Sequence, residues 1–141
     1  MSGPAVRPAS AGDLDAAAAI GARPFAAGWS RAALAEELGR DDSIFLVAPG
    51  RGYALARVVG DDCRLLDLAA AEDGAGVGRA LMAALLAAAK GRGCAKVSFE
   101  ASAANARALA FYEKAGARVV GRRPKFYYDG SDAVLLDLDI P

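Results

Sequence analysis

The residue pattern with the clearest chemical meaning is a glycine-rich segment, Gly74-Ala75-Gly76-Val77-Gly78-Arg79-Ala80, at a junction between a strand pattern and a helix pattern. Glycines at such a junction let backbone N–H groups converge, and the N-terminus of the next helix adds roughly half a positive charge. Both features attract anions, so the segment predicts a site for a phosphate or pyrophosphate group. A glycine-rich turn without any ligand has the same composition, and this segment alone does not exclude it.

Two well-known phosphate-binding motifs do not fit this segment. A Walker loop requires Gly-Lys-Ser/Thr at its end, but Gly78 is followed by Arg79-Ala80. A dinucleotide fingerprint requires Gly-x-Gly-x-x-Gly, and the position three after Gly76 is Arg79. A nucleoside triphosphatase and a dinucleotide-dependent enzyme are therefore disfavoured.

Further along the chain are three residues that could transfer protons or bind a cofactor. Glu100 ends the apolar strand pattern Val97-Ser98-Phe99, where burial should raise the pKa of its carboxyl group towards that of a general base. Tyr112 lies seven residues after Asn105, on the same face of a predicted helix. Each has a purely structural alternative: a solvated carboxylate at a strand end, a tyrosine packed on a sheet, and a helix N-cap.

The composition narrows the chemistry and the class of protein. The chain has 141 residues with 55% hydrophobic content, the size of one domain, so we expect a single domain over residues 1–141. There is no histidine, which removes imidazole as a base or metal ligand. Cys63 and Cys94 are read as reduced, semi-buried residues, and no metal site is expected.

Charge and hydropathy bear on partners and location. Seventeen basic and 17 acidic residues give a net charge of zero, so no nucleic acid is expected as the main partner. The N-terminus lacks a signal-peptide pattern, and the longest apolar run, Ala80 to Ala89, is too short to span a bilayer. We therefore expect a cytoplasmic protein that does not enter a membrane.

The elements that must position these residues can be read from hydrophobic periodicity. In the first half of the chain, a short strand near Val6-Arg7 precedes a helix, and Ser30 is a candidate N-cap for a second helix that ends at Gly39. An antiparallel meander is predicted next, because three apolar runs are separated by turn residues. The runs are Ile44 to Ala48, Tyr53 to Val59 and Cys63 to Ala70.

The second half changes to a strand-helix-strand pattern. A long helix from Gly78 to Lys90 leads to a strand from Lys96 to Glu100, which predicts a right-handed parallel crossover. A further helix is expected from Asn105 to Ala115, followed by strands at Arg118 to Gly121 and Ala133 to Leu138. The fold class is therefore α/β with a mixed sheet.

Several of these segments together resemble the GCN5-related N-acetyltransferase (GNAT) family, and within it the bacterial ribosomal-protein-alanine N-acetyltransferases. The resemblance is carried by Leu68-Ala69-Ala70, by Gly76 to Leu81, by Glu100 and, most specifically, by the helix Asn105 to Gly116. It extends to Trp29-Ser30, Arg122-Arg123 and Phe126-Tyr127. It implies a mostly antiparallel central sheet flanked by helices, with a splayed pair of parallel strands, and acetyl-CoA as the acetyl donor.

The resemblance also implies roles for individual residues. The backbone of Leu68, Ala69 and Ala70 should pair with the pantetheine arm, and the loop of Gly74, Ala75, Gly76, Val77, Gly78 and Arg79 should hold the pyrophosphate. Asn105 should contact the cofactor. Glu100 is implied as the general base, acting through water, and Tyr112 as the general acid for the departing thiolate. Trp29, Arg123 and Tyr127 are expected to hold the acceptor. The alternatives are a core position for Trp29 and a hairpin surface for Tyr127. Arg122 and Arg123 could instead contact the CoA 3′-phosphate or form a solvated pair.

The acceptor that the resemblance implies is an N-terminal α-amine, such as the alanine of a small-subunit ribosomal protein. A lysine or small-molecule amine acetyltransferase, an acyl-CoA-binding module without turnover, and a glycine-loop nucleotide-binding module are the alternatives. Two departures bear on the cofactor: Asp73 stands where the family has Arg or Gln, and the segment between Ala70 and Gly76 is about two residues shorter. Ala117 replaces an aromatic residue that commonly follows the helix.

Overall fold

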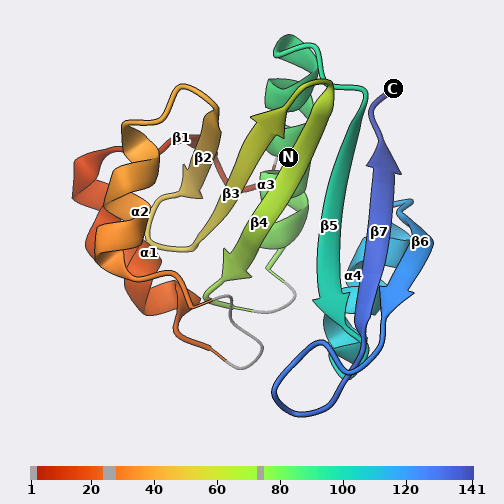
Figure 1. Cartoon of the computed structure of the whole chain (residues 1–141). Helices are drawn as coiled ribbons and strands as arrows, with labels where there is room; N and C mark the ends of the chain where they lie inside the picture. The colour runs from red at the N-terminus through yellow and green to blue at the C-terminus, as the bar shows by residue number, and fades with distance from the viewer. Residues whose placement is uncertain (1–2, 24–27, 73–74) are drawn as a thin grey trace.

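The computed structural model describes residues 3–23, 28–72 and 75–141 (Figure 1). The chain begins with a short strand and a helical segment, continues through a three-stranded meander, and ends with two helices and three more strands. The elements are β1 (Arg7–Pro8), a 3-10 turn (Ala11–Asp13), α1 (Leu14–Gly21), α2 (Arg31–Leu38), β2 (Ser43–Ala48), β3 (Gly52–Val59), β4 (Asp62–Ala70), α3 (Val77–Gly91), β5 (Lys96–Ser102), α4 (Ala106–Lys114), β6 (Arg118–Arg123) and β7 (Ala133–Asp139).

The strands form one seven-stranded sheet in the order β1-β2-β3-β4-β5-β7-β6. Neighbouring strands are antiparallel except for β4 and β5, which are parallel and are joined by the crossover helix α3. The expected mixed, mostly antiparallel sheet flanked by helices is confirmed. The meander and the parallel crossover also form where the periodicity places them.

Helices cover both faces of the sheet (Figure 1). Helices α1 and α2 pack on one face over a cluster that includes Leu34, Tyr53 and Leu55. Helices α3 and α4 pack on the other face over a larger cluster that includes Leu85 and Phe99. None of the described helices has both the length and the apolar character that crossing a membrane requires.

Local chemistry explains where several elements begin and how they pack. The Ser30 hydroxyl accepts a bond of 3.1 Å from the Ala33 N–H and caps α2, as the sequence predicts. A Cβ at Gly52 would lie 2.5 Å from the carbonyl oxygen of Ala69 and 2.8 Å from Val77. The absence of a side chain at this glycine therefore lets the start of α3 pack closely on β3 and β4.

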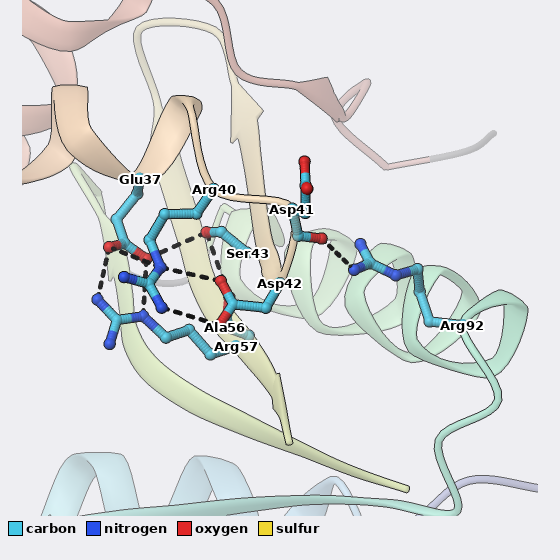
Figure 2. A network of polar contacts seen from close by, with 8 residues as sticks. All are labelled: Glu37, Arg40, Asp41, Asp42, Ser43, Ala56, Arg57 and Arg92. Carbon is cyan, nitrogen blue, oxygen red and sulfur yellow. Dashed lines mark hydrogen bonds and ion pairs between the residues drawn. The ribbon is translucent and has the colours of Figure 1, made fainter. Parts of the chain in front are cut away.

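A network of charged side chains joins α2 to the meander (Figure 2). The Glu37 side chain is 2% exposed, and both of its oxygens accept bonds from Arg57 on β3, at 3.0 and 2.6 Å. The Ser43 hydroxyl on β2 donates to the same carboxylate at 3.2 Å. Hydrogen bonds from Arg57 lower the pKa of Glu37. The bidentate pair thus holds α2 against β3 across the intervening strand.

Replacing Glu37 by Gln should lower the free energy of unfolding by about 2 kcal/mol at pH 7, because Arg57 loses its charged partner in a site that is only partly exposed. A lowered folded-state pKa contributes stability that is present above the unfolded-state pKa and is lost as the pH falls through the folded value. The difference between wild type and E37Q, measured by urea unfolding, should therefore shrink below about pH 4. E36Q, which changes an exposed carboxylate of the same helix, is the control, and equal effects of the two variants at pH 7 would contradict the account.

Candidate active site

The candidate site begins where β4 and β5 separate. Within the described chain the two strands pair at three positions, Asp62 with Lys96, Cys63 with Val97 and Arg64 with Ser98. Beyond Arg64 the strands diverge (Figure 1), while β4 stays paired with β3 up to Ala70. The implied splayed pair of parallel strands is therefore present. It leaves the edge of β4 at residues 65–70 without a strand partner on the β5 side, and this edge includes Leu68, Ala69 and Ala70.

The glycine-rich segment lies at the start of α3. Gly76 is the N-cap of α3 and has φ of +79°, a left-handed conformation that side chains disfavour. The first helical bond runs from the Ala80 N–H to the Gly76 carbonyl, so the N–H groups of Val77, Gly78 and Arg79 have no partner within the helix. Val77 is buried, whereas the Arg79 side chain is exposed. This part of the segment can therefore offer backbone donors to an anion, as the sequence predicts.

The other residues of the glycine-rich loop are Asp73, Gly74 and Ala75. Asp73 and Gly74 lie outside the described residues, so their expected roles stay predictions. Ala75 is half-buried beside the start of α3. A Cβ at Gly78 would come within 3.4 Å of the Phe111 ring of α4, which shows how closely α4 approaches the first turn of α3.

Helix α4 carries Asn105 and Tyr112. The Asn105 side-chain oxygen accepts a bond of 3.2 Å from the Ala108 N–H, so the N-cap interpretation is confirmed and a cofactor contact stays a prediction. The Tyr112 ring lies between Phe99 of β5 and Phe111, with ring centroids 4.3 and 5.4 Å away. Burial raises the pKa of Tyr112 to about 12, with a smaller contribution from the charge of Asp67. The hydroxyl therefore keeps its proton at neutral pH, as a general acid must.

Glu100 lies within β5, which continues to Ser102, rather than at the strand end. Its side chain is 24% exposed and forms an ion pair of 3.7 Å with Arg123 at the end of β6. Burial, with the charge of Glu100, raises the pKa of Tyr127 in the β6–β7 loop. The Glu100 side chain is thus less buried than the sequence predicts. The face of β5 that carries Glu100 lies beside the β6–β7 loop and the edge strand β6, and no helix covers it in the described structure. Glu100, Arg123 and Tyr127 are nevertheless brought together.

The positions of Trp29 and Arg122 agree with the structural alternatives, which are a core position for Trp29 and a solvated position for Arg122. Trp29 is half-buried and packs against the hydrophobic cluster under α1 and α2. Arg122 forms an ion pair of 3.4 Å with Asp132. Their predicted contacts with acceptor or cofactor stay predictions.

A group of polar residues that the sequence reading did not single out lies on the β4 side of the opening. The Asp67 side chain is 6% exposed and accepts hydrogen bonds from Arg23, at 2.7 Å, and from the Tyr53 hydroxyl. Arg23 also donates to the carbonyl oxygen of Leu68 at 3.0 Å. The one signal in the sequence is a carboxylate inside an apolar strand, Leu65-Leu66-Asp67-Leu68-Ala69; nothing marks Arg23.

Both groups of charged residues face the same side of the sheet. Side chains alternate along a strand, and Phe99 packs in the cluster under α3 and α4, so Glu100 points to the opposite face. Tyr53, which donates to Asp67, packs in the cluster under α1 and α2. The sheet face on the side of α1 and α2 thus carries both groups. Arg23 and Asp67 lie on the β4 side of the opening, and Glu100 and Arg123 lie on the β5 side.

Comparison with known proteins agrees with this geometry. The sequence profile of the acetyltransferase (GNAT) family matches residues 15–117. The chain belongs to the GNAT acetyltransferase family. It is 35% identical to the [ribosomal protein bS18]-alanine N-acetyltransferase of Escherichia coli K12 over 136 residues, which cover 91% of this chain and 92% of that protein.

Solved structures show the same relationship. The crystal structure of the ribosomal-protein-S18-alanine N-acetyltransferase from Escherichia coli superposes with a TM-score of 0.82 at 30% identity, over 96% of this chain and 93% of that one. Ard1 from Thermoplasma volcanium has a TM-score of 0.84 at 22% identity, with 97% of each chain covered, and shares the fold. The predicted family, enzyme class and fold are therefore confirmed.

Members of this family take the acetyl group from acetyl-CoA, as the resemblance implies. The residues present suit such a donor. The open edge of β4 offers backbone groups to the amides of a pantetheine arm, and the first turn of α3 offers N–H donors to a pyrophosphate. The residues on these two surfaces are mostly Leu, Val, Ala and Gly, which leaves the backbone accessible.

Replacing Gly76 by Ala should weaken acetyl-CoA binding by at least about tenfold, measured by isothermal titration. No described residue lies within 4 Å of the added Cβ, so the effect comes from the left-handed φ of +79°. This conformation costs an alanine about 1–2 kcal/mol, and its relaxation turns the adjoining N–H groups.

Gly93 is a matched control, because it has φ of +81°, equally open surroundings and a position at the other end of α3. G93A should lose similar stability and bind acetyl-CoA as wild type does. Equal affinities of G76A and G93A would show that the first turn of α3 does not bind the donor.

Proposed function

We propose that this protein transfers the acetyl group of acetyl-CoA to the α-amine of an N-terminal residue, namely the alanine of a small-subunit ribosomal protein in the cytoplasm. The observation that supports the proposal is the divergence of β4 and β5. Tyr112 packs on Phe99 of β5, Glu100 is the next residue of that strand, and α3 begins shortly after the end of β4. The relative at 35% identity, whose name specifies the alanine of bS18, supports the choice of acceptor.

The residues of the opening can perform a direct transfer. Bound acetyl-CoA supplies a thioester carbonyl as the electrophile. Glu100 accepts the proton that the attacking amine loses, through a water molecule, while Tyr112 donates its proton to the departing sulfur. The N–C bond forms as the C–S bond breaks. Glu100 then releases its proton to solvent, and solvent returns a proton to Tyr112. Cys63 and Cys94 are free and buried, and burial raises the pKa of both thiols, so neither suits the role of an acyl carrier.

The partly exposed position of Glu100 fits an α-amine acceptor better than a lysine acceptor. An α-amine with a pKa near 7.8 is roughly 10–20% neutral at pH 7, whereas a lysine amine is neutral only about 0.04% of the time. The difference in free energy is about 3.5 kcal/mol. When the acceptor amine is already partly neutral, a carboxylate that is 24% exposed and acts through water has to contribute less free energy to its deprotonation.

The β6 and β7 side of the opening supplies contacts for the acceptor. Arg123 pairs with Glu100 and lies 5.5 Å from the centroid of the Phe126 ring, and Tyr127 lies beside Glu100. We infer that Arg123 and Tyr127 flank the acceptor residue next to the base. Trp29, which packs against the cluster under α1 and α2, would contact the acceptor from the β4 side of the opening.

Purified protein with acetyl-CoA should acetylate a peptide that begins with the alanine of a small-subunit ribosomal protein. Mass spectrometry locates the product on the α-amine. The same peptide with a blocked N-terminus and an internal lysine should stay unmodified, as should a polyamine. Transfer to lysine or polyamine alone would favour a different acetyltransferase, and binding of acetyl-CoA without transfer to any amine would favour an acyl-CoA-binding module.

Tyr112→Phe and Glu100→Gln should each lower kcat by about 10²- to 10⁴-fold while acetyl-CoA still binds, because each removes one proton-transfer group and preserves shape. Tyr128 is fully exposed, so Tyr128→Phe is the matched control and should retain wild-type kcat. A kcat within about threefold of wild type for both site variants would contradict their assignment as acid and base.

A further inference from the structure

The cluster of Arg23, Asp67 and Tyr53 occupies the arm of the opening that faces Glu100 across the gap. Arg23 follows α1 and lies 44 positions before Asp67 in the sequence. Its guanidinium donates to the Asp67 carboxylate, to the carbonyl of Leu68 at 3.0 Å and to the carbonyl of Gly21 at 3.2 Å. The side chain is thus fixed in place on the open edge of β4.

The Tyr53 hydroxyl of this cluster packs closely against Gly21 at the end of α1. A Cβ at Gly21 would lie 2.5 Å from the Tyr53 hydroxyl oxygen, so any larger residue at this last position of α1 would displace the hydroxyl from Asp67. Burial and the contact with Asp67 raise the pKa of Tyr53, which therefore stays a hydrogen-bond donor. A buried carboxylate with two donors is costly to place where apolar residues could fill the same volume. This cost points to a use for the guanidinium that Asp67 holds.

The guanidinium has capacity left for a ligand. An arginine has five N–H donors, and in the described part of the chain Arg23 donates hydrogen bonds to Asp67, Leu68 and Gly21 and also interacts with the Tyr53 hydroxyl. Among the described residues, at least one N–H donor therefore remains for a ligand. Its side chain is 27% exposed although Asp67 beneath it is almost fully covered. The charge of Asp67 raises the pKa of Tyr112 and that of Arg23 lowers it, so the cluster lies within electrostatic range of Tyr112.

We propose that Arg23 is a specificity-determining residue that donates a hydrogen bond to the carbonyl oxygen of the acceptor's first residue. The proposal rests on the proposed function. In an N-terminal residue the amine nitrogen and the carbonyl carbon are both bonded to Cα. An amine held near Glu100 therefore directs the carbonyl oxygen of the same residue across the gap. A lysine side chain or a polyamine carries no carbonyl at that distance from its amine. Arg23 would thereby select α-amines of peptides.

A pair of substrates tests this contact. One is an alanyl peptide, and the other is the same peptide with its first peptide bond replaced by a trans-alkene, which keeps the shape and removes the carbonyl together with the N–H. Because the alkene also raises the pKa of the amine, kcat/KM is compared per neutral amine for both substrates. Wild type should prefer the peptide by about 10- to 100-fold in kcat/KM, the range for one charge-assisted hydrogen bond. In Arg23→Met the peptide should lose that factor, while kcat/KM for the alkene should stay within about twofold of wild type.

Arg57→Met is the matched control. Arg57 is 33% exposed and pairs with a buried carboxylate, Glu37, as Arg23 does with Asp67, but it belongs to the network that joins α2 to the meander (Figure 2). It should lose comparable stability and keep the wild-type preference. Arg23→Lys, which keeps a charge beside Asp67, serves if Arg23→Met does not fold, and it should narrow the preference at least severalfold because the forked donors are lost.

The outcomes separate the two claims. If wild type acetylates neither substrate, the proposed function is wrong and the inference fails with it. If wild type acetylates both equally, or if the variants lower kcat/KM for both by the same factor, then transfer stands and Arg23 is only structural. A preference that disappears in the Arg23 variants and persists in Arg57→Met supports the carbonyl contact.

Discussion

The site depends on the divergence of β4 and β5. Two parallel strands that pair at three positions and then separate expose backbone N–H and C=O groups, which need partners from a ligand or from water. The crossover helix α3 starts at the open end of β4 and adds, at the same place, the N–H donors of its first turn that have no partner within the helix. A strand edge and a helix terminus are thus presented together, and a ligand with amides and a pyrophosphate can satisfy both.

The two arms of the opening are built differently. The β4 arm is held by the meander and by helices α1 and α2, and its polar residues are locked by Asp67, which is nearly inaccessible. The β5 arm is held by β7 and α4, and its polar residues lie near the surface, where Arg123 reaches Glu100 at 3.7 Å. A rigid wall beside a more accessible one suits a reaction in which the donor binds along one strand edge and a peptide end enters beside the other.

Local signals in the sequence predicted much of the fold. Ser30 and Asn105 cap helices in the structure, and the turn residues separate the strands of the meander as expected. These features depend on residues close together in the chain. The glycine loop was recognisable for the same reason, because a helix start with φ of +79° at Gly76 requires glycine and neighbouring donors.

Contacts between distant residues were not predictable in this way. The pairing of Arg23 with Asp67 spans 44 positions, and that of Arg57 with Glu37 spans 20, so periodicity gives no sign of either. The burial of Glu100 was overestimated because an apolar strand says nothing about what covers its other face. The family resemblance supplied the roles of Tyr112 and Glu100, which residue types and spacing alone left open.

Hydrogen–deuterium exchange of the backbone amides, with and without acetyl-CoA, tests the central claim most directly. The account predicts protection in residues 66–70 of β4 and 76–80 at the start of α3, because the donor would occupy the open edge and the first turn. Strand β6 also has an edge without a strand partner in the described sheet, and its residues 118–121, which precede Arg122 and Arg123, serve as an internal reference that should exchange equally in both conditions. Protection confined to other segments, or none at residues 66–70, would contradict the account.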